Sequence, residues 1–185
     1  MYSGAVLAGG ASRRFGEDKA LFVYRGKPLL LWVLESLRGA EERFIVANRP
    51  YVGFGVPVYP DLLPGADSLS GLHSALAHAR FPWVAVAATD LPFLTRGFWD
   101  FLYEQARASP YPVVAVYSPE GHLEPLMALY HKDCLPQVER QIREGDFRLG
   151  RVVEALGATY VAAEEVVARF GERVYLNANR RADLP

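Results

Sequence analysis

The chain has 185 residues, of which 51% are hydrophobic and 22% charged, and its formal net charge at pH 7 is -1. This length and composition predict a single globular domain with a sizeable core, and the net charge excludes an overall basic field for nucleic acid or an anionic membrane. No apolar run approaches the ~20 residues that span a bilayer, so we expect no membrane association. Because the net charge is close to zero, we also expect no nucleic-acid partner. The single cysteine, Cys134, excludes an internal disulfide and predicts a reducing, cytoplasmic location.

A glycine-rich, cationic loop follows the first predicted strand, Tyr2–Leu7. Two adjacent glycines without Cβ atoms let the backbone approach a ligand closely, and successive N–H groups in such a turn form a concave anion site. Two arginines and a lysine add positive charge, and the planar arginine fork suits phosphate oxygens. The loop therefore predicts a polyphosphate site. Its candidate ligands are Gly9, Gly10, Arg13, Arg14 and Lys19.

The remaining apolar runs alternate between strand and helix patterns. Further strands are expected at Phe44–Val46, Val56–Tyr59, Trp83–Ala88, Pro112–Val116, Leu126–Tyr130, Thr159–Ala162 and Val174–Leu176. Helices are expected at Pro28–Leu37, Gly71–His78, Thr95–Ala106, Lys132–Glu144 and Leu149–Leu156. This alternation predicts an α/β fold with a mostly parallel sheet covered on both faces, in which the last strands include an antiparallel member.

Polar residues follow three of the predicted strands. Asn48, Asp61 and Asp90 all stand at strand ends, and ligands of open α/β sheets bind beyond the carboxyl ends of the strands. Asp90 follows the continuously apolar run Trp83–Ala88, and Mg²⁺ is held by one or two carboxylates plus substrate phosphates. A turn or helix-cap aspartate is the alternative, for which Pro92 is suitable context. We assign Asp90 the metal role because the first loop already predicts phosphate binding.

Several common motifs are absent from the sequence. Gly9 and Gly10 are adjacent, so G-x-G-x-x-G fails and a nicotinamide oxidoreductase is disfavoured; the P-loop pattern fails because Glu17 follows Gly16. Without H-E-x-x-H, G-x-S-x-G or C-x-x-C, nucleophilic catalysis by the protein is unsupported. Phosphoryl-type transfer, which depends on positioning and charge neutralisation, is compatible with this pattern.

The segment Leu7–Lys19 resembles the signature of nucleotidyltransferases that join an NTP to a phosphorylated acceptor. That signature reads L-A-G-G-x-S-x-R-M-G-x-D-K, and Phe15 replaces its methionine here. Within this class the chain is most similar to the molybdenum cofactor guanylyltransferases. The resemblance implies a Rossmann-like, GT-A-like three-layer sandwich. It also implies one domain over residues 1–185, with a nucleotide half at about 1–95 and an acceptor half at about 96–185.

The resemblance further implies the reaction and its participants. GMP would pass from GTP to Mo-molybdopterin, with Mg²⁺ as cofactor, to give the guanine dinucleotide form and pyrophosphate. Molybdoenzyme apoproteins and other cofactor-biosynthesis proteins are the expected protein partners. The implied catalytic residues are Lys19, Asp90 and Arg14, and Asp90 is also the implied metal ligand. The implied nucleotide-binding residues are Leu7, Ala8, Gly9, Gly10, Lys19, Asn48, Asp61, Gly71 and Asp90.

Three shorter segments resemble the family in part. In the family's G-P-L-x-G-[LIM] loop, Asp67 and Ser68 replace the usual glycine and proline, while Gly71 is kept and is expected to open a helix that faces the ligand. Glu124-Pro125-Leu126 resembles an E-P-L step that leads past the acceptor site. Asn177-Ala178-Asn179 resembles a closing N-x-N-T-P motif, with two arginines replacing Thr-Pro.

Two other readings stay open at this point. One is a related cytidylyl or sugar-phosphate nucleotidyltransferase, although Gly9-Gly10 favours the guanylyl type by resemblance. The other is a non-catalytic nucleotide-binding protein that delivers the cofactor, which the retention of Lys19 and Asp90 disfavours.

Overall fold

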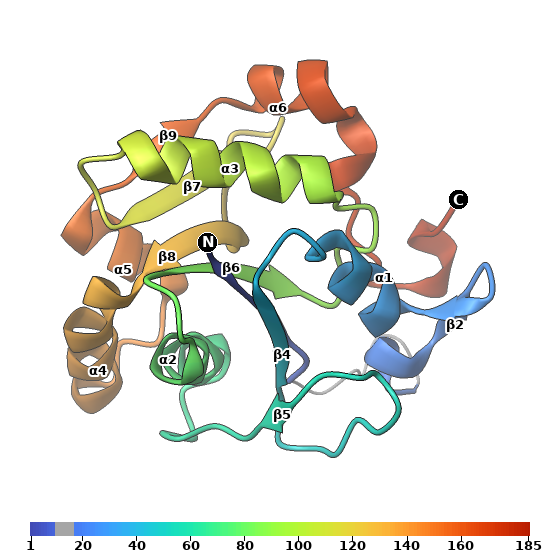
Figure 1. Cartoon of the computed structure of the whole chain (residues 1–185), viewed down its shortest axis with the longest axis horizontal. Coiled ribbons are helices and arrows are strands. Elements are labelled where there is room, and N and C mark those ends of the chain that lie inside the picture. The colour runs from blue at the N-terminus through green and yellow to red at the C-terminus, as the bar shows by residue number, and fades with distance from the viewer. Residues whose placement is uncertain (10–16) are drawn as a thin grey trace.

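A computed structural model describes residues 1–9 and 17–185 of the chain. Within them, a seven-stranded sheet has the order β5-β4-β1-β6-β8-β7-β9 (Figure 1). Its strands are β1 (Ser3–Leu7), β4 (Glu42–Val46), β5 (Val58–Tyr59), β6 (Trp83–Ala88), β7 (Val113–Tyr117), β8 (Leu123–His131) and β9 (Thr159–Val161). A separate antiparallel hairpin consists of β2 (Val23–Tyr24) and β3 (Lys27–Pro28).

The sheet is mostly parallel, as predicted. β1 pairs in parallel with β4 on one side and β6 on the other, whereas β8 runs antiparallel to both β6 and β7. Ala87, near the carboxyl end of β6, pairs with Met127 in the middle of β8, so the amino-terminal half of β8 lies at the same edge as the carboxyl ends of β1, β4 and β6. Side chains from the parallel strands and from the antiparallel strand β8 therefore meet at that edge.

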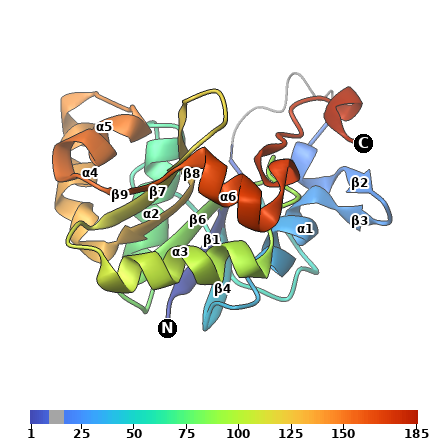
Figure 2. The ribbon, with the colours of Figure 1, turned by 90° about the horizontal axis from the view of Figure 1, so that it is seen from above.

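Helices cover both faces of the sheet, which confirms the predicted three-layer sandwich. They are α1 (Leu29–Ser36), α2 (Ser68–His78), α3 (Arg96–Ala108), α4 (Leu135–Glu144), α5 (Leu149–Leu156) and α6 (Ala163–Phe170). α1, α3 and α6 pack on one face and α2, α4 and α5 on the other; Figure 2 shows α3 beside α6 and α4 beside α5. None of the helices in the described part of the chain has both the length and the apolar character needed to cross a membrane.

The two cores follow from strand alternation. Successive residues of a strand point to opposite faces, so Val6 and Ile45 join the core under α1 and α3, while Ala5 and Phe44 join the core under α2. Both sets are fully or almost fully buried. A sheet buried on both faces explains why the strand runs are continuously apolar rather than alternating with polar residues.

Several predicted bounds need correction. Val174–Leu176 is not a strand: the chain forms the 3₁₀ helix η3 (Glu172–Tyr175), because a three-residue apolar run does not distinguish the two periodicities. Gly71 does not open α2, which begins at Ser68 and keeps Gly71 inside the helix. Helix α6 was not predicted at all, and β8 begins three residues before the predicted Leu126.

Candidate active site

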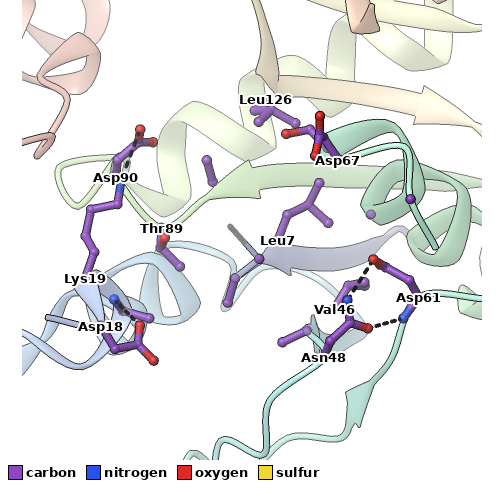
Figure 3. A pocket seen from close by; sticks show the side chains of 18 residues that line it. Leu7, Asp18, Lys19, Val46, Asn48, Asp61, Asp67, Thr89, Asp90 and Leu126 are labelled. Atoms are coloured by element: carbon purple, nitrogen blue, oxygen red, sulfur yellow. Dashed lines mark hydrogen bonds and ion pairs between the residues drawn. The ribbon is translucent and has the colours of Figure 1, made fainter. Parts of the chain in front are cut away.

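A cavity of about 400 Å³ opens at the edge of the sheet where β1, β4 and β6 end (Figure 3). The first strand, the turn after residues 10–16, the ends of β4 and β6 and the start of α2 all contribute to its wall. The residues that line it are Leu7, Ala8, Gly9, Asp18, Lys19, Ala20, Val46, Ala47, Asn48, Asp61, Gly65, Asp67, Ser68, Gly71, Ala88, Thr89, Asp90 and Leu126.

Lys19 and Asp90 face one another in this cavity. Lys19 begins the 3₁₀ helix η1 (Lys19–Leu21), and Asp90 lies just beyond the end of β6. The Lys19 Nζ atom is 3.6 Å from Asp90 Oδ2, and each side chain is 22% exposed. Figure 3 shows the lysine side chain extended toward the carboxylate. The pair places a cation suited to phosphate oxygens and an anion suited to a metal ion within reach of one ligand.

Asp18 is the best-connected carboxylate of the cavity wall. Its Oδ1 accepts a hydrogen bond from the backbone N of Ala20 at 3.1 Å and thereby caps η1. The Tyr51 hydroxyl lies 2.9 Å from Asp18 Oδ2, and Arg49 Nη1 lies 3.3 Å from the same oxygen. Burial, followed by the hydrogen bond to Asp18, raises the pKa of the Tyr51 hydroxyl, which therefore stays protonated and donates.

Asn48 and Asp61 form a reciprocal pair beyond the ends of β4 and β5. Asn48 Nδ2 donates to Asp61 Oδ2 at 3.0 Å, and the Asp61 backbone N donates to Asn48 Oδ1 at 2.9 Å. Figure 3 shows both hydrogen bonds, which together restrict the rotamer of Asn48, while the first also restricts that of Asp61. The pair gives the wall opposite Asp90 a defined set of polar atoms.

The start of α2 closes another side of the cavity. Asp67, the residue before the helix, has φ 51° and ψ -129° and makes no side-chain capping hydrogen bond. This backbone conformation is one that glycine adopts without strain and other residues do not. Gly71 lies against β1: a Cβ atom added to it would be 3.0 Å from Leu7 Cδ1. The absence of a side chain at Gly71 therefore permits close packing of α2 on the end of β1.

Asp90 also interacts with the C-terminal segment and with Glu124 of β8. The backbone N of Ala178 donates to the backbone oxygen of Asp90 at 2.8 Å, which supports the loop that carries the carboxylate. Glu124 of β8 is half-buried. Its burial, and then the negative charge of Asp90, raise the pKa of Glu124. The segment that resembles the family's E-P-L step is thus electrostatically coupled to Asp90.

The residues present fit a hard divalent cation such as Mg²⁺. Asp90 offers a partly exposed carboxylate in the cavity, and Mg²⁺ is bound through one or two carboxylates with substrate phosphates and water completing the octahedron. Among the described residues there is no cluster of three or more His, Cys, Asp or Glu that could hold a metal on its own. A metal at Asp90 would therefore share its coordination with the ligand's phosphates.

Comparison with known proteins identifies the family to which this chain belongs. Residues 4–160 match the model of the MobA-like NTP transferase domain. The chain belongs to this family. It is accordingly an enzyme of the nucleotidyltransferase class, as the first-loop motif predicted.

The relatives of this MobA-like chain cover nearly all of its length. A protein of Deinococcus radiodurans named as a probable molybdenum cofactor guanylyltransferase is 39% identical over 97% of this chain and 90% of its own. A Thermococcus sibiricus protein of the same name is 34% identical over 98% of this chain and 94% of its own. The crystal structure of molybdopterin-guanine dinucleotide biosynthesis protein A from Archaeoglobus fulgidus superimposes with a TM-score of 0.85, at 28% identity, over 98% of this chain and 94% of that one.

The predicted site residues divide into two sets. Gly10 and Arg14, together with Arg13, lie outside the described residues. The other predicted site residues all line the cavity described above, and their roles remain predictions. They are Leu7, Ala8, Gly9, Lys19, Asn48, Asp61, Gly71 and Asp90.

Sequence reasoning missed three residues near this cavity. Asp18 stands in the D-K step of the matched motif, so the signal for it was present. Asp67 was noted only as a departure from the family's glycine. Tyr51 carried no pattern, because its relation to Asp18 arises only from the fold.

Proposed function

We propose that this protein transfers GMP from GTP to Mo-molybdopterin, giving the guanine dinucleotide form of the cofactor and pyrophosphate. The observation that carries the proposal is the placement of Lys19 and Asp90, 3.6 Å apart, in one cavity of a MobA-like fold. The names of the relatives supply the nucleotide and the acceptor. Molybdoenzyme apoproteins would be the recipients of the product.

In the proposed reaction a phosphate oxygen of the acceptor forms a bond to the α-phosphorus of GTP. The bond from the α-phosphorus to the bridging α–β oxygen breaks, and pyrophosphate leaves with the electron pair. The attacking oxygen is already anionic, so the protein needs no strong general base. The protein then needs only to position the acceptor phosphate and GTP and to compensate the negative charge of their phosphates.

The described residues suit that work. The Lys19 ammonium would compensate charge that develops on the departing pyrophosphate. Asp90 would hold Mg²⁺, which, when bound, neutralises and orients the phosphate oxygens. The Asn48–Asp61 pair presents a restrained polar surface for the nucleoside, and the start of α2 lines the cavity, where the positive end of a helix dipole favours a phosphate.

The test is pyrophosphate release when the purified protein is mixed with Mo-molybdopterin, Mg²⁺ and each of GTP, CTP, ATP and UTP. We expect release with GTP that needs both the acceptor and Mg²⁺. Calorimetric titration with the four nucleotides in Mg²⁺ measures base preference separately from turnover.

Each alternative has its own outcome. Faster release with CTP would replace the guanylyl proposal by a cytidylyl one. Tight binding of GTP without pyrophosphate release in the presence of acceptor would favour a non-catalytic delivery protein.

A further inference from the structure

Tyr51 connects two chain segments that enclose the cavity. Its side chain is buried, with 6% of its surface exposed. The hydroxyl oxygen lies 2.9 Å from Asp18 Oδ2 and 3.4 Å from the backbone oxygen of Ala8. Ala8 directly follows β1, and Asp18 directly precedes Lys19. One hydroxyl therefore sits between the end of the first strand and the turn that carries the lysine.

We propose that Tyr51 is a positioning residue for the transfer reaction: its hydroxyl holds Asp18, and through Asp18 the turn that carries Lys19, against the end of β1. This inference rests on the proposed function, since it assigns Lys19 its task.

Asp18 transmits the restraint to Lys19 through the cap of η1. The Asp18 side chain accepts from the backbone N of Ala20 at 3.1 Å, and its backbone oxygen accepts from the N of Leu21 at 3.1 Å. Both bonds set the course of the chain on either side of the Lys19 Cα atom. A carboxylate fixed at Asp18 thus fixes the direction in which Lys19 leaves the turn toward Asp90.

The hydroxyl is the stronger of the two restraints on the Asp18 carboxylate. Arg49 also reaches Asp18 Oδ2, at 3.3 Å, but its side chain is 59% exposed, and exposed ion pairs contribute little. The Tyr51 contact is shorter, at 2.9 Å, and comes from a buried side chain, and a hydrogen bond to an ionised carboxylate is stronger than one between neutral groups. The ring packs edge-on against Phe54, with centroids 6.2 Å apart, so it stays in place when only the hydroxyl is removed.

The test compares Tyr51→Phe with a matched control, Tyr2→Phe. Tyr2 is also buried, at 3% exposed, and its hydroxyl also donates to a carboxylate, that of Asp100 at 3.2 Å, but it lies at the opposite edge of the sheet. Misplacing a catalytic group lowers the rate of the chemical step, so we expect Tyr51→Phe to reduce kcat for GTP about ten- to a hundredfold while KM changes much less. Tyr2→Phe should leave kcat unchanged.

A double-mutant cycle separates positioning of Lys19 from a general structural effect. If Tyr51 acts through Lys19, Tyr51→Phe should have no further effect on kcat in a Lys19→Met background. Wild-type kcat in Tyr51→Phe, or effects of the two substitutions that multiply, would overturn the proposal.

Amide hydrogen exchange measured by NMR tests the restraint on Asp18 without relying on enzyme activity. A wild-type protein that transfers no nucleotide would refute that function but leave this restraint open to measurement. Faster exchange of the Ala20 amide in Tyr51→Phe than in Tyr2→Phe would support the restraint, because that amide is bonded to Asp18. Equal exchange in the two variants would overturn it.

Discussion

The Lys19 ammonium lies 3.6 Å from the Asp90 carboxylate, although one residue begins a 3₁₀ turn and the other follows a strand in the middle of the sheet. The two side chains are partly exposed to the cavity rather than buried against one another. A pair in that setting contributes little to folding and can exchange its internal contact for contacts to a ligand. We therefore propose that the pair serves ligand binding and catalysis rather than stability.

The first prediction separates function from stability at this pair. Lys19→Met should lower kcat about 10²- to 10³-fold, the usual loss for one preorganised charge donor, and Asp90→Asn should abolish Mg²⁺-dependent turnover. The free energy of unfolding should change by less than about 1 kcal/mol in either variant. Steady-state kinetics and urea titration measure the two effects. Lys27→Met, which breaks a lysine–glutamate pair outside the cavity lining, is the control and should keep wild-type kcat. Equal kcat in Lys19→Met and Lys27→Met would contradict the assignment.

The second prediction concerns the contact between α2 and β1. In Gly71→Ala, the new Cβ would lie 3.0 Å from Leu7 Cδ1, and because Leu7 lines the cavity, we expect its side chain to shift toward the bound nucleotide. We expect weaker GTP binding by calorimetry, with a stability change of no more than about 1 kcal/mol because alanine favours the helix. Gly150→Ala in α5 meets nothing within 4 Å and is the control. It should stabilise by about 0.5–1 kcal/mol and leave GTP affinity unchanged. Unchanged affinity in Gly71→Ala would show that Leu7 does not define the binding surface.

The third prediction tests backbone strain at Asp67. Glycine adopts φ 51°, ψ -129° without a steric penalty, so Asp67→Gly should relieve backbone strain at this position. Glycine also adds entropy to the unfolded chain, which opposes this gain, and we expect the free energy of unfolding to rise by about 1 kcal/mol in total. Asp67→Ala removes the carboxylate but keeps the Cβ atom, and should not stabilise. Urea unfolding of the two variants provides the measurement. If alanine stabilised as much as glycine, the cause would be the charge rather than the backbone.

The fourth prediction follows from the raised pKa of Glu124. A carboxyl group whose pKa is higher in the folded than in the unfolded state contributes stability below its unfolded pKa of about 4.5, and this contribution is lost as the pH rises through the folded pKa. Glu124→Gln should therefore raise Tm at pH 7 and lose that advantage near pH 4. Thermal unfolding without Mg²⁺ measures this, and Glu144→Gln, at an exposed glutamate, is the control. A Tm gain that is the same at both pH values would exclude titration of Glu124 as the cause.

Much of the architecture could be predicted because it depends on local apolar runs. The strands Ser3–Leu7 and Trp83–Ala88 are buried on both faces and read as continuous hydrophobic segments. Once both are parallel, their carboxyl ends must share an edge of the sheet, and that geometry favours the proximity of Lys19 to Asp90. The family resemblance rested mainly on the segment that follows the first of these strands, Leu7–Lys19.

The remaining features depend on tertiary contacts that leave no periodic signal. Tyr51 stands alone in an irregular segment, and only the fold brings it to Asp18. Val174–Leu176 is too short for its pattern to distinguish a strand from the 3₁₀ turn that forms. Helix α6 was missed because eight residues span little more than two helical turns, which is too short for the period of its apolar residues to be recognised.

The reversed direction of β8 has a consequence for protein engineering. Its amino end pairs with the carboxyl end of β7, Leu126 of β8 lines the cavity, and the turn between the two strands is closed by hydrogen bonds between Ser118 and both Gly121 and His122. Residues inserted into that turn would extend the hairpin that carries Glu124 without breaking any pairing inside the sheet. Libraries of loop length and sequence at 119–121 therefore offer a way to vary the surface next to Glu124 while Lys19 and Asp90 are kept unchanged.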